Sequence, residues 1–255
     1  MDVLIFSGQS NMQGQTEGLP ACNETVDGAW EYRYLTDSLK PLNFPVGEDF
    51  CDGKAVLLRE SVNGGGSLVP ACCRAYVKTS GRQAVAVHVA RGATTVAEWQ
   101  PDTLRYQTMV QKIRAAKKKV GEVERIWFIW LQGESDALIG TTETEYQRLF
   151  ERMKNALKQD VGVERFGFIK VGYFASQATW YNEGSMEERV QKDETIMRAQ
   201  ETIVSENEDC FMLTRICETL SRDSRYINPF ESGHYNNDGM DKIGQETGET
   251  LAKLR

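Results

Sequence analysis

The first fourteen residues constrain the fold of this 255-residue chain more than any other stretch. Residues 2–6 form a short run of apolar strand formers, and the polar turn Ser-Gly-Gln-Ser-Asn-Met-Gln-Gly follows directly at residues 7–14. An apolar run of this length that stops at Ser and Gly is typical of a buried strand. Ser10 therefore falls just after the carboxyl end of a strand, where open α/β sheets hold their ligands.

Ser10 has two interpretations at this point. A serine that is held in place by the strand behind it suits nucleophilic catalysis, provided that a base can reach its hydroxyl. The simpler alternative is a polar strand-to-helix turn in which the Ser10 side chain caps the helix. The rest of the chain has to decide between the two.

Apolar strands and amphipathic helices alternate along the remaining sequence. After the opening strand we expect four more strands, at residues 83–90, 125–131, 166–173 and 210–213. We expect helices between them and after the last one, at residues 67–77, 102–120, 142–157, 185–206 and from about 238 onward, with Asp102 as a helix cap. Uniformly apolar strands that alternate with helices predict a five-stranded parallel sheet covered on both faces.

No internal repeat or linker interrupts this alternation, so we expect one domain over residues 1–255. Residues 15 to about 60 are rich in Pro, Asp, Asn and Gly, and they predict a loop-rich insertion that forms one wall of a cleft. Within it, residues 30–35 alternate at period two, which favours a short edge strand. The three glycines at 64–66 precede a helix without the Lys and Ser/Thr of a phosphate-binding loop, so they predict a tight turn.

Charge and hydrophobicity exclude several classes of partner. The chain has 30 Lys and Arg against 37 Asp and Glu, a net charge of −7, which argues against nucleic acid and anionic membranes as partners. No apolar run reaches the roughly 18 residues of a membrane span, and no leader-like segment precedes the opening strand. We expect a cytoplasmic protein, unless a signal peptide has been removed from the sequence.

Cysteine and histidine usage does not indicate a metal site. The six cysteines include no C-x-x-C pair and the chain has only two histidines, so a zinc site is not expected. Cys72 and Cys73 stand next to each other in an apolar run and are expected to be small core residues. His88 lies inside an apolar strand and is expected to be a core histidine as well.

Polar groups follow the strands at four places, and a parallel sheet brings such groups to one edge. Ser10 could attack an ester carbonyl there, with His234 taking its proton and later returning it to the leaving alcohol. Glu231, three residues before the histidine, could hold the imidazole in the right tautomer. The developing oxyanion would find donors in the N–H groups of Ser10 and Gly92 and in the side-chain amide of Gln132.

Taken together, three strings resemble the SGNH hydrolase superfamily, and within it the sialate O-acetylesterase-like and acetylxylan esterase family of carbohydrate esterases. They are S-G-Q-S-N-M-Q-G at residues 7–14, W-L-Q-G-E-S-D at 130–136, and H-Y-N at 234–236 followed by Gly239. Residues 92–99, which begin with Gly and end with Trp, resemble a further segment of this family. The resemblance runs in order from residue 7 to residue 244.

The resemblance implies a three-layer α/β/α flavodoxin-like fold and an acetylesterase that works without a cofactor. It implies Ser10 as nucleophile, His234 as base, Gly92 as backbone oxyanion donor and Gln132 in place of the superfamily's oxyanion asparagine. The matched segments also contain Gln9, Asn11 and Trp99, and Arg91 directly precedes one of them. We expect these four residues to contact the substrate.

Two residues depart from the family pattern. Arg91 stands where a second glycine is usual, which places a cation at the rim of the cleft. Glu231 stands where an aspartate is usual, so the acid of the triad stays open between Glu231, Glu134 and a backbone carbonyl.

The function that we expect is a serine esterase that removes O-acetyl groups from a sugar through an acyl-enzyme intermediate. Xylo-oligosaccharides and sialic acids are both open as substrates, and Arg91 or Arg33 is a candidate contact for a sialic acid carboxylate. One alternative is a non-catalytic carbohydrate-binding protein on the same scaffold. Another is an esterase or thioesterase for other small acyl groups, although no apolar lid helix is evident in the sequence.

Overall fold

A mixed sheet of seven strands forms the centre of the computed structural model, which describes residues 1–16, 21, 24–49, 56–57 and 66–254. Across the sheet the strands follow the order β3-β2-β6-β1-β7-β8-β9. Their bounds are β1 Asp2–Gly8, β2 Ala29–Arg33, β3 Ser38–Pro41, β6 Ala84–Ala90, β7 Arg125–Leu131, β8 Arg165–Ile169 and β9 Cys210–Thr214. All neighbours are parallel except β2 and β3.

The five predicted strands are present, but the expected strand count was too low. The insertion supplies β2 and β3, which extend the sheet beyond β6. The stretch predicted as an edge strand is therefore an inner strand, and β3 is the edge. The predicted strand at 166–173 ends early, because the Val171 N–H leaves the sheet and donates to Gln200 Oε1 on a covering helix, at 3.0 Å.

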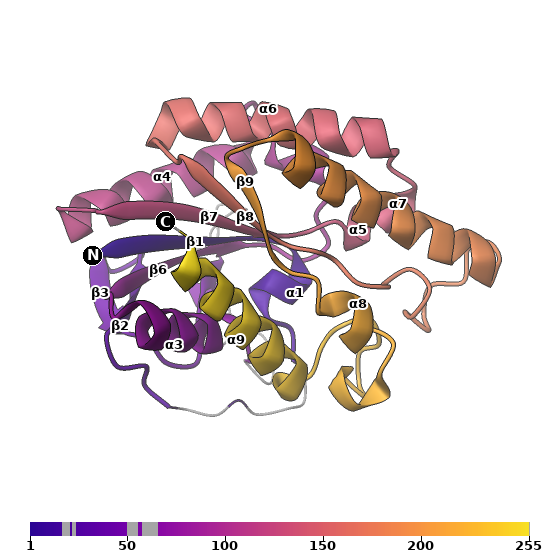
Figure 1. Cartoon of the computed structure of the whole chain (residues 1–255), viewed down its shortest axis with the longest axis horizontal. Helices are drawn as coiled ribbons and strands as arrows, with labels where there is room; N and C mark the ends of the chain where they lie inside the picture. Colours follow the sequence, from indigo (N-terminus) through magenta and orange to yellow (C-terminus); the bar gives the residue numbers. More distant parts are fainter. Residues whose placement is uncertain (17–20, 22–23, 50–55, 58–65, 255) are drawn as a thin grey trace.

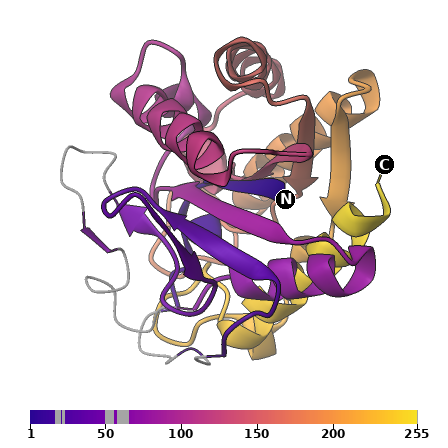
Figure 2. The ribbon, with the colours of Figure 1, turned by 90° about the vertical axis from the view of Figure 1, so that its left-hand side faces the viewer.

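Helices cover both faces, as Figures 1 and 2 show. One layer consists of α3 (Val69–Ser80) and α9 (Asn237–Lys253), which pack against each other. The other layer contains α4 (Leu104–Val120), α6 (Glu143–Val161) and α7 (Met186–Glu206). Thr103 rather than the predicted Asp102 caps α4, since its side chain accepts from the Tyr106 N–H. The three-layer α/β/α prediction is confirmed.

Short helices stand at the strand ends and in the connections. They are α1 (Ser10–Gln13) after β1, α5 (Glu134–Ile139) after β7, α8 (Cys217–Leu220) after β9, and the 3₁₀ turns η1 (Val96–Trp99) and η2 (Ser224–Tyr226). β1 is the central strand, with β6 on one side and β7 on the other. The chain moves to one side of β1 for β2 and β6 and then crosses to the other side for β7. This reversal is the topological switch point at which α/β sheets bind ligands.

A buried ion pair joins the described part of the insertion to helix α4. Glu48, in the short ribbon of β4 (Glu48–Asp49) and β5 (Val56–Leu57), accepts from Lys112 Nζ of α4 at 2.9 Å. The same carboxylate accepts from the Tyr34 and Leu35 N–H groups at 2.6 and 3.0 Å, so its charge is compensated on several sides. The predicted turn at 64–66 falls outside the described residues except for Gly66.

The core contains the residues that the apolar strands predicted. Cys72 and Cys73 are fully buried, as expected, while Cys22 and Cys51 lie outside the described residues. His88 is also a core residue, with Nε2 3.1 Å from the Met12 carbonyl oxygen. In the described residues, no helix is long and apolar enough to cross a lipid bilayer.

Candidate active site

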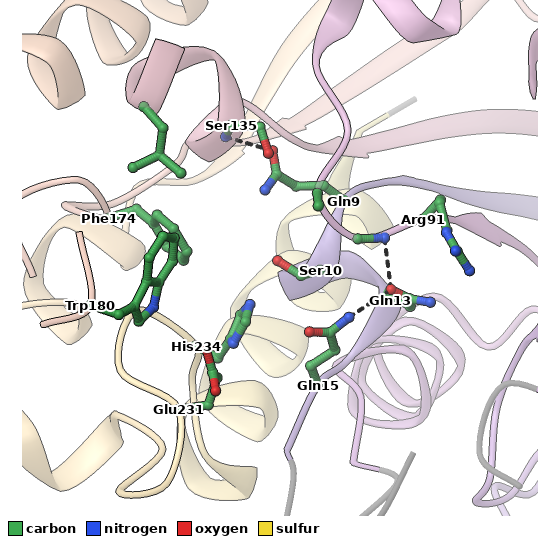
Figure 3. A pocket seen from close by; sticks show the side chains of 13 residues that line it. Gln9, Ser10, Gln13, Gln15, Arg91, Ser135, Phe174, Trp180, Glu231 and His234 are labelled. Carbon is green, nitrogen blue, oxygen red and sulfur yellow. Dashed lines mark hydrogen bonds between the residues drawn. The ribbon is translucent and has the colours of Figure 1, made fainter. Parts of the chain in front are cut away.

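A cavity of about 410 Å³ opens at the carboxyl edge of the sheet, beside the switch point (Figure 3). Residues from after β1, β6 and β7 and from the loops before α7 and α9 line it: Gln9, Ser10, Gln13, Gln15, Arg91, Gly92, Ala93, Ser135, Leu138, Phe174, Trp180, Glu231 and His234. Ser10 and His234, the predicted nucleophile and base, thus lie in one cavity although they stand near opposite ends of the sequence. Over the part of the chain that the structure describes, no three His, Cys, Asp or Glu side chains could together hold a metal ion.

Ser10 is the first residue of α1, directly behind the end of the central strand. Its N–H belongs to the first turn of a helix, where amides have no acceptor within the helix. Gly92, at the end of β6, approaches it closely, because a Cβ at Gly92 would stand 3.4 Å from Ser10 Cβ and 2.9 Å from Gln13 Oε1. A side chain here would displace the ends of the Gln13 and Gln15 side chains, and the predicted backbone donor lies beside the predicted nucleophile.

The Gly92 N–H already has an acceptor in this structure. It donates to Gln13 Oε1 at 2.7 Å, and Gln15 Nε2 donates to the same oxygen at 2.9 Å (Figure 3). The Gln13 side chain must therefore move before the Gly92 N–H can donate to a substrate. Sequence reasoning missed Gln13, which it counted only as one residue of the polar turn.

Gln132 lies beneath the cavity rather than on its wall. Its side chain is fully buried, and its Nε2 donates to Asp136 Oδ2 at 2.5 Å and to the Thr94 carbonyl at 2.9 Å. The Tyr146 hydroxyl donates to Gln132 Oε1 at 3.1 Å. Both ends of the Gln132 amide are thus hydrogen-bonded inside the protein, and Gln132, expected from the family motif as an oxyanion donor, does not line the cavity.

Gln9 is the glutamine that does line the cavity. Its Oε1 accepts from Gln132 Nε2 at 3.2 Å, from the Gly133 N–H at 3.3 Å and from the Ser135 N–H at 3.0 Å. These donors connect the β1 turn to the β7 turn. Figure 3 shows the nitrogen end of the same side chain directed into the cavity on the side of Ser10.

His234 is carried by the loop that leads into α9, and Asn11 fixes this loop to α1. Asn11 Oδ1 accepts from the Tyr235 N–H at 3.3 Å, and Asn11 Nδ2 lies 3.5 Å from the Gly233 carbonyl oxygen. Gly233 has a φ of +93°, and a Cβ there would meet the Phe174 ring at 2.7 Å. The backbone on both sides of the histidine is thereby positioned.

The His234 ring itself makes fewer polar contacts. Its Nδ1 is buried without a hydrogen-bond partner among the described residues, and the Phe174 ring packs against it at a centroid distance of 5.7 Å. Burial lowers the pKa of His234 to about 4, so the imidazole is neutral at neutral pH. A neutral imidazole is the form that can accept a proton from a serine hydroxyl.

The two candidate acids occupy different places. Glu231 lines the cavity on the His234 loop and lies next to the histidine in Figure 3, although the hydrogen bond between these two residues is the backbone one from the His234 N–H to the Glu231 carbonyl, at 3.2 Å. Glu134 is buried under the cavity, where Oε1 accepts from Asn11 Nδ2 at 2.9 Å and Oε2 has no partner among the described residues. Burial raises the pKa of Glu134 to about 7.

Two of the four expected substrate contacts do not line the cavity. Gln9 and Arg91 line the cavity, but Asn11 is 1% exposed and serves the scaffold, and Trp99 is fully buried with Nε1 donating to Thr94 Oγ1 at 3.0 Å. Trp99 does lie near the site, as the motif predicts, but the Trp99 ring is packed in the core beneath the cavity. Arg33, the other candidate for a carboxylate contact, does not line this cavity and pairs with Glu31.

An aromatic wall opposite the strand ends was not predicted as part of the site. Phe174 and Trp180 form it, with ring centroids 6.0 Å apart, and Trp180 is 52% exposed. The wall is held by the buried Asp193 of α7, whose carboxylate accepts from the N–H groups of residues 174, 175 and 176 at 2.8–3.1 Å. The only signal for it in the sequence was a loop with adjacent aromatics before the 185–206 helix.

Comparison with known proteins gives one family. Residues 1–214 match the model of the family described as carbohydrate esterase, sialic acid-specific acetylesterase. A probable carbohydrate esterase of Arabidopsis thaliana is 29% identical over 85 residues, which cover 33% of this chain and 32% of that protein. The aligned stretch thus spans about a third of the curated relative's length.

Solved structures share the fold at low sequence identity. An Arabidopsis thaliana protein superposes with a TM-score of 0.68 at 17% identity, over 100% of this chain and 99% of that one. NanS gives 0.62 at 16% identity, over 98% and 96% of the two chains. A carbohydrate acetylesterase from Xanthomonas citri gives 0.58 at 14% identity, over 98% of this chain and 55% of that one.

Proposed function

Because this chain belongs to the carbohydrate esterase family of sialic acid-specific acetylesterases, we propose that it is a serine esterase that removes O-acetyl groups from a sugar. Ser10 is the nucleophile and His234 is the general base. The observation that carries the proposal is that both side chains line one cavity at the switch point of the sheet. If Ser10 and His234 did not share a cavity, the similarity to the family would support only the fold.

The reaction follows from these positions. Ser10 Oγ bonds to the acetyl carbon while His234 takes the hydroxyl proton, and the sugar oxygen leaves with that proton. The acetyl-enzyme is then hydrolysed by water, which gives its proton to the same imidazole and regenerates Ser10. The neutral resting state of His234 supports its role as base at neutral pH.

Glu231 is the acid that we assign to the imidazolium. It lines the same cavity three residues before His234, and the buried Nδ1 of the histidine has no hydrogen-bond partner in the described structure. A carboxylate that approaches Nδ1 would stabilise the charge formed during proton transfer. Glu134 is tied to Asn11 and acts on the histidine only through the loop that Asn11 holds.

The carbohydrate part of the substrate is supported by the shape of the cavity. Its volume of about 410 Å³ falls within the usual range for small-molecule sites. Trp180 presents a half-exposed ring at the rim, and its Nε1 is 3.3 Å from the Ser232 carbonyl, so one edge of the ring is fixed. A fixed aromatic face suits packing against the apolar face of a sugar ring.

Acetate release tests the proposal directly. Wild-type protein and Ser10→Ala are incubated with p-nitrophenyl acetate and with a panel of O-acetylated sialic acid, acetylated xylo-oligosaccharides and a longer-chain acyl sugar. We expect release from acetylated sugars by the wild type and none above background by Ser10→Ala. Equal release by the two proteins, or none by the wild type on any acetyl ester, would rule out the serine esterase. Faster release of the longer acyl group would show that the preferred substrate is not an acetyl ester.

A further inference from the structure

We propose that the side-chain amide of Gln9 donates a hydrogen bond to the acyl oxygen in the transition state, and that Gln132 is a positioning residue that orients this amide. This inference deepens the proposed serine esterase function and depends on it. It assigns the side-chain oxyanion donor to the residue before the nucleophile, not to the glutamine of the β7 turn.

The orientation of the Gln9 amide follows from its partners. Two backbone N–H groups, of Gly133 and Ser135, point at one end of the amide at 3.3 and 3.0 Å. A backbone N–H can only donate, so that end must be the oxygen, and the amide assignment is not open to a flip. The NH₂ group is thereby placed at the opposite end, which Figure 3 shows directed into the cavity.

The NH₂ group of Gln9 also has its hydrogens available. Gln9 is 1% exposed and lines the cavity, yet no acceptor for its nitrogen is found among the described residues. Because this nitrogen faces the cavity, a group inside the cavity can reach it. A ligand oxygen in the cavity would supply the missing acceptor.

The other expected side-chain donor is engaged elsewhere. Gln132 Nε2 donates to Asp136, Thr94 and Gln9 and does not reach the cavity. Its hydrogen bond to Gln9 Oε1 contributes to the orientation described above, which makes Gln132 a positioning residue. Gln9 precedes Ser10 in the chain, so its amide stays close to the atom that attacks.

The chemistry of the step explains why this position matters. When Ser10 Oγ bonds to the acyl carbon, the π electrons of the carbonyl move onto its oxygen, which becomes negatively charged. A donor that is already oriented toward that oxygen stabilises the transition state more than the ground state. Loss of one such donor typically lowers kcat by about 10²–10³.

Gln9→Glu is the variant that separates the two ends of the amide. It keeps an oxygen that can accept from the Gly133 and Ser135 N–H groups but replaces the donor with a second oxygen. With p-nitrophenyl acetate at pH 8 we expect kcat to fall about 10²–10³-fold with KM changed much less. Lowering the pH should recover part of the loss, since a protonated carboxyl can donate again. A structural role would not produce this recovery.

The matched control is Gln245→Glu, which adds the same charge at an exposed glutamine of α9 that does not line this cavity. We expect its kcat to stay within a few-fold of wild type, because exposed charges interact weakly. Thermal unfolding of both variants accompanies the kinetics. Wild-type hydrolysis that Ser10→Ala abolishes, together with a Gln9→Glu kcat within a few-fold of wild type, would overturn the inference while leaving the esterase intact. An inactive wild type would instead remove the proposed function itself.

A measurement on the unaltered protein covers the case in which Gln9→Glu does not fold. Methylboronic acid forms a tetrahedral anionic adduct with an active serine and so reproduces the charge of the transition state. We expect the side-chain ¹⁵NH₂ resonances of Gln9 to shift downfield when the adduct forms, and those of Gln132 to stay in place. A shift of Gln132 without one of Gln9 would contradict the assignment.

Discussion

The strand side of the cavity and the His234 loop are held in different ways. On the strand side, the oxygen of Gln9 has three donors and both ends of the Gln132 amide are bonded. On the other side, the backbone around His234 is tethered by Asn11, but Nδ1 of the ring has no hydrogen-bond partner within the described part of the chain. Beneath it, one carboxylate oxygen of Glu134 also has no partner among the residues that the structure describes.

This difference shows which side chains are fixed before substrate binds: the amides of Gln9 and Gln132 are, whereas the Gly92 N–H is still bonded to Gln13. Hydrogen-bond donors that are fixed in advance need no reorganisation during the reaction, which is where most electrostatic catalysis originates. Contacts of a general base are often long in an empty site and tighten only when substrate is bound. We therefore expect the strand side to respond to mutation through kcat, and the histidine side to depend also on pH and on the tether to Asn11.

Removal of the imidazole should have the largest effect. For His234→Ala we expect a loss of at least about 10⁴-fold in kcat with the fold retained, since the base is essential and the ring contributes little to the core. Acetate release and thermal unfolding measure the two quantities. The control is His88→Gln, at the buried histidine of β6, which we expect to lower stability while kcat stays within about tenfold, roughly 1.4 kcal/mol. An equal loss of kcat in both variants would mean that His234 and His88 do not differ in their role in the reaction.

Removal of the hydrogen bonds by which Asn11 holds the His234 loop should have the next largest effect on kcat. Asn11→Ala removes the contacts to Glu134, Gly233 and Tyr235 together, and we expect kcat to fall about 10²-fold because the imidazole is displaced relative to Ser10. Asn11→Asp keeps the acceptor for the Tyr235 N–H but loses the donor, so its kcat should lie between those of wild type and alanine. An alanine variant with wild-type kcat would show that the loop is positioned by its other contacts.

The two acids provide a sharper comparison. For Glu231→Gln we expect a loss of about tenfold in kcat, the equivalent of one charge-assisted hydrogen bond of about 1.5 kcal/mol. Glu134→Gln keeps an oxygen for Asn11 and removes a buried carboxyl, so we expect less than a threefold change, about 0.6 kcal/mol. If Glu134→Gln causes the larger loss, Glu134 is the acid of the triad and the order of the two is reversed.

The smallest of the expected effects is that of pH on kcat/KM near neutrality. Because the pKa of His234 is lowered to about 4, the base is neutral above that pH, and kcat/KM should be flat from about pH 5 to 8 and fall tenfold per pH unit below about 4. Glu134, with its pKa raised to about 7, ionises within the flat range. A second inflection near pH 7 that disappears in Glu134→Gln would show that this carboxyl takes part in the reaction.

The sequence by itself determined the order of strands and helices and the edge of the sheet at which the site forms. Apolar runs that end in Gly and Ser mark the carboxyl ends of parallel strands, and a parallel sheet brings those ends together regardless of their distance along the chain. For this reason the sequence alone places Ser10, Gly92 and His234 near one another. The sheet was underestimated because β2 and β3 lie in a turn-rich stretch with weak periodicity.

Only the tertiary structure decided what each polar side chain does at that edge. Gln9 and Gln132 are both glutamines beside a strand end, yet one lines the cavity and the other is buried beneath it. The aromatic wall of Phe174 and Trp180 likewise depends on a carboxylate of α7 that receives three backbone N–H groups. The physical reason is that hydrophobic periodicity is a local property of the chain, whereas the direction of a buried amide is set by donors and acceptors that come from remote segments.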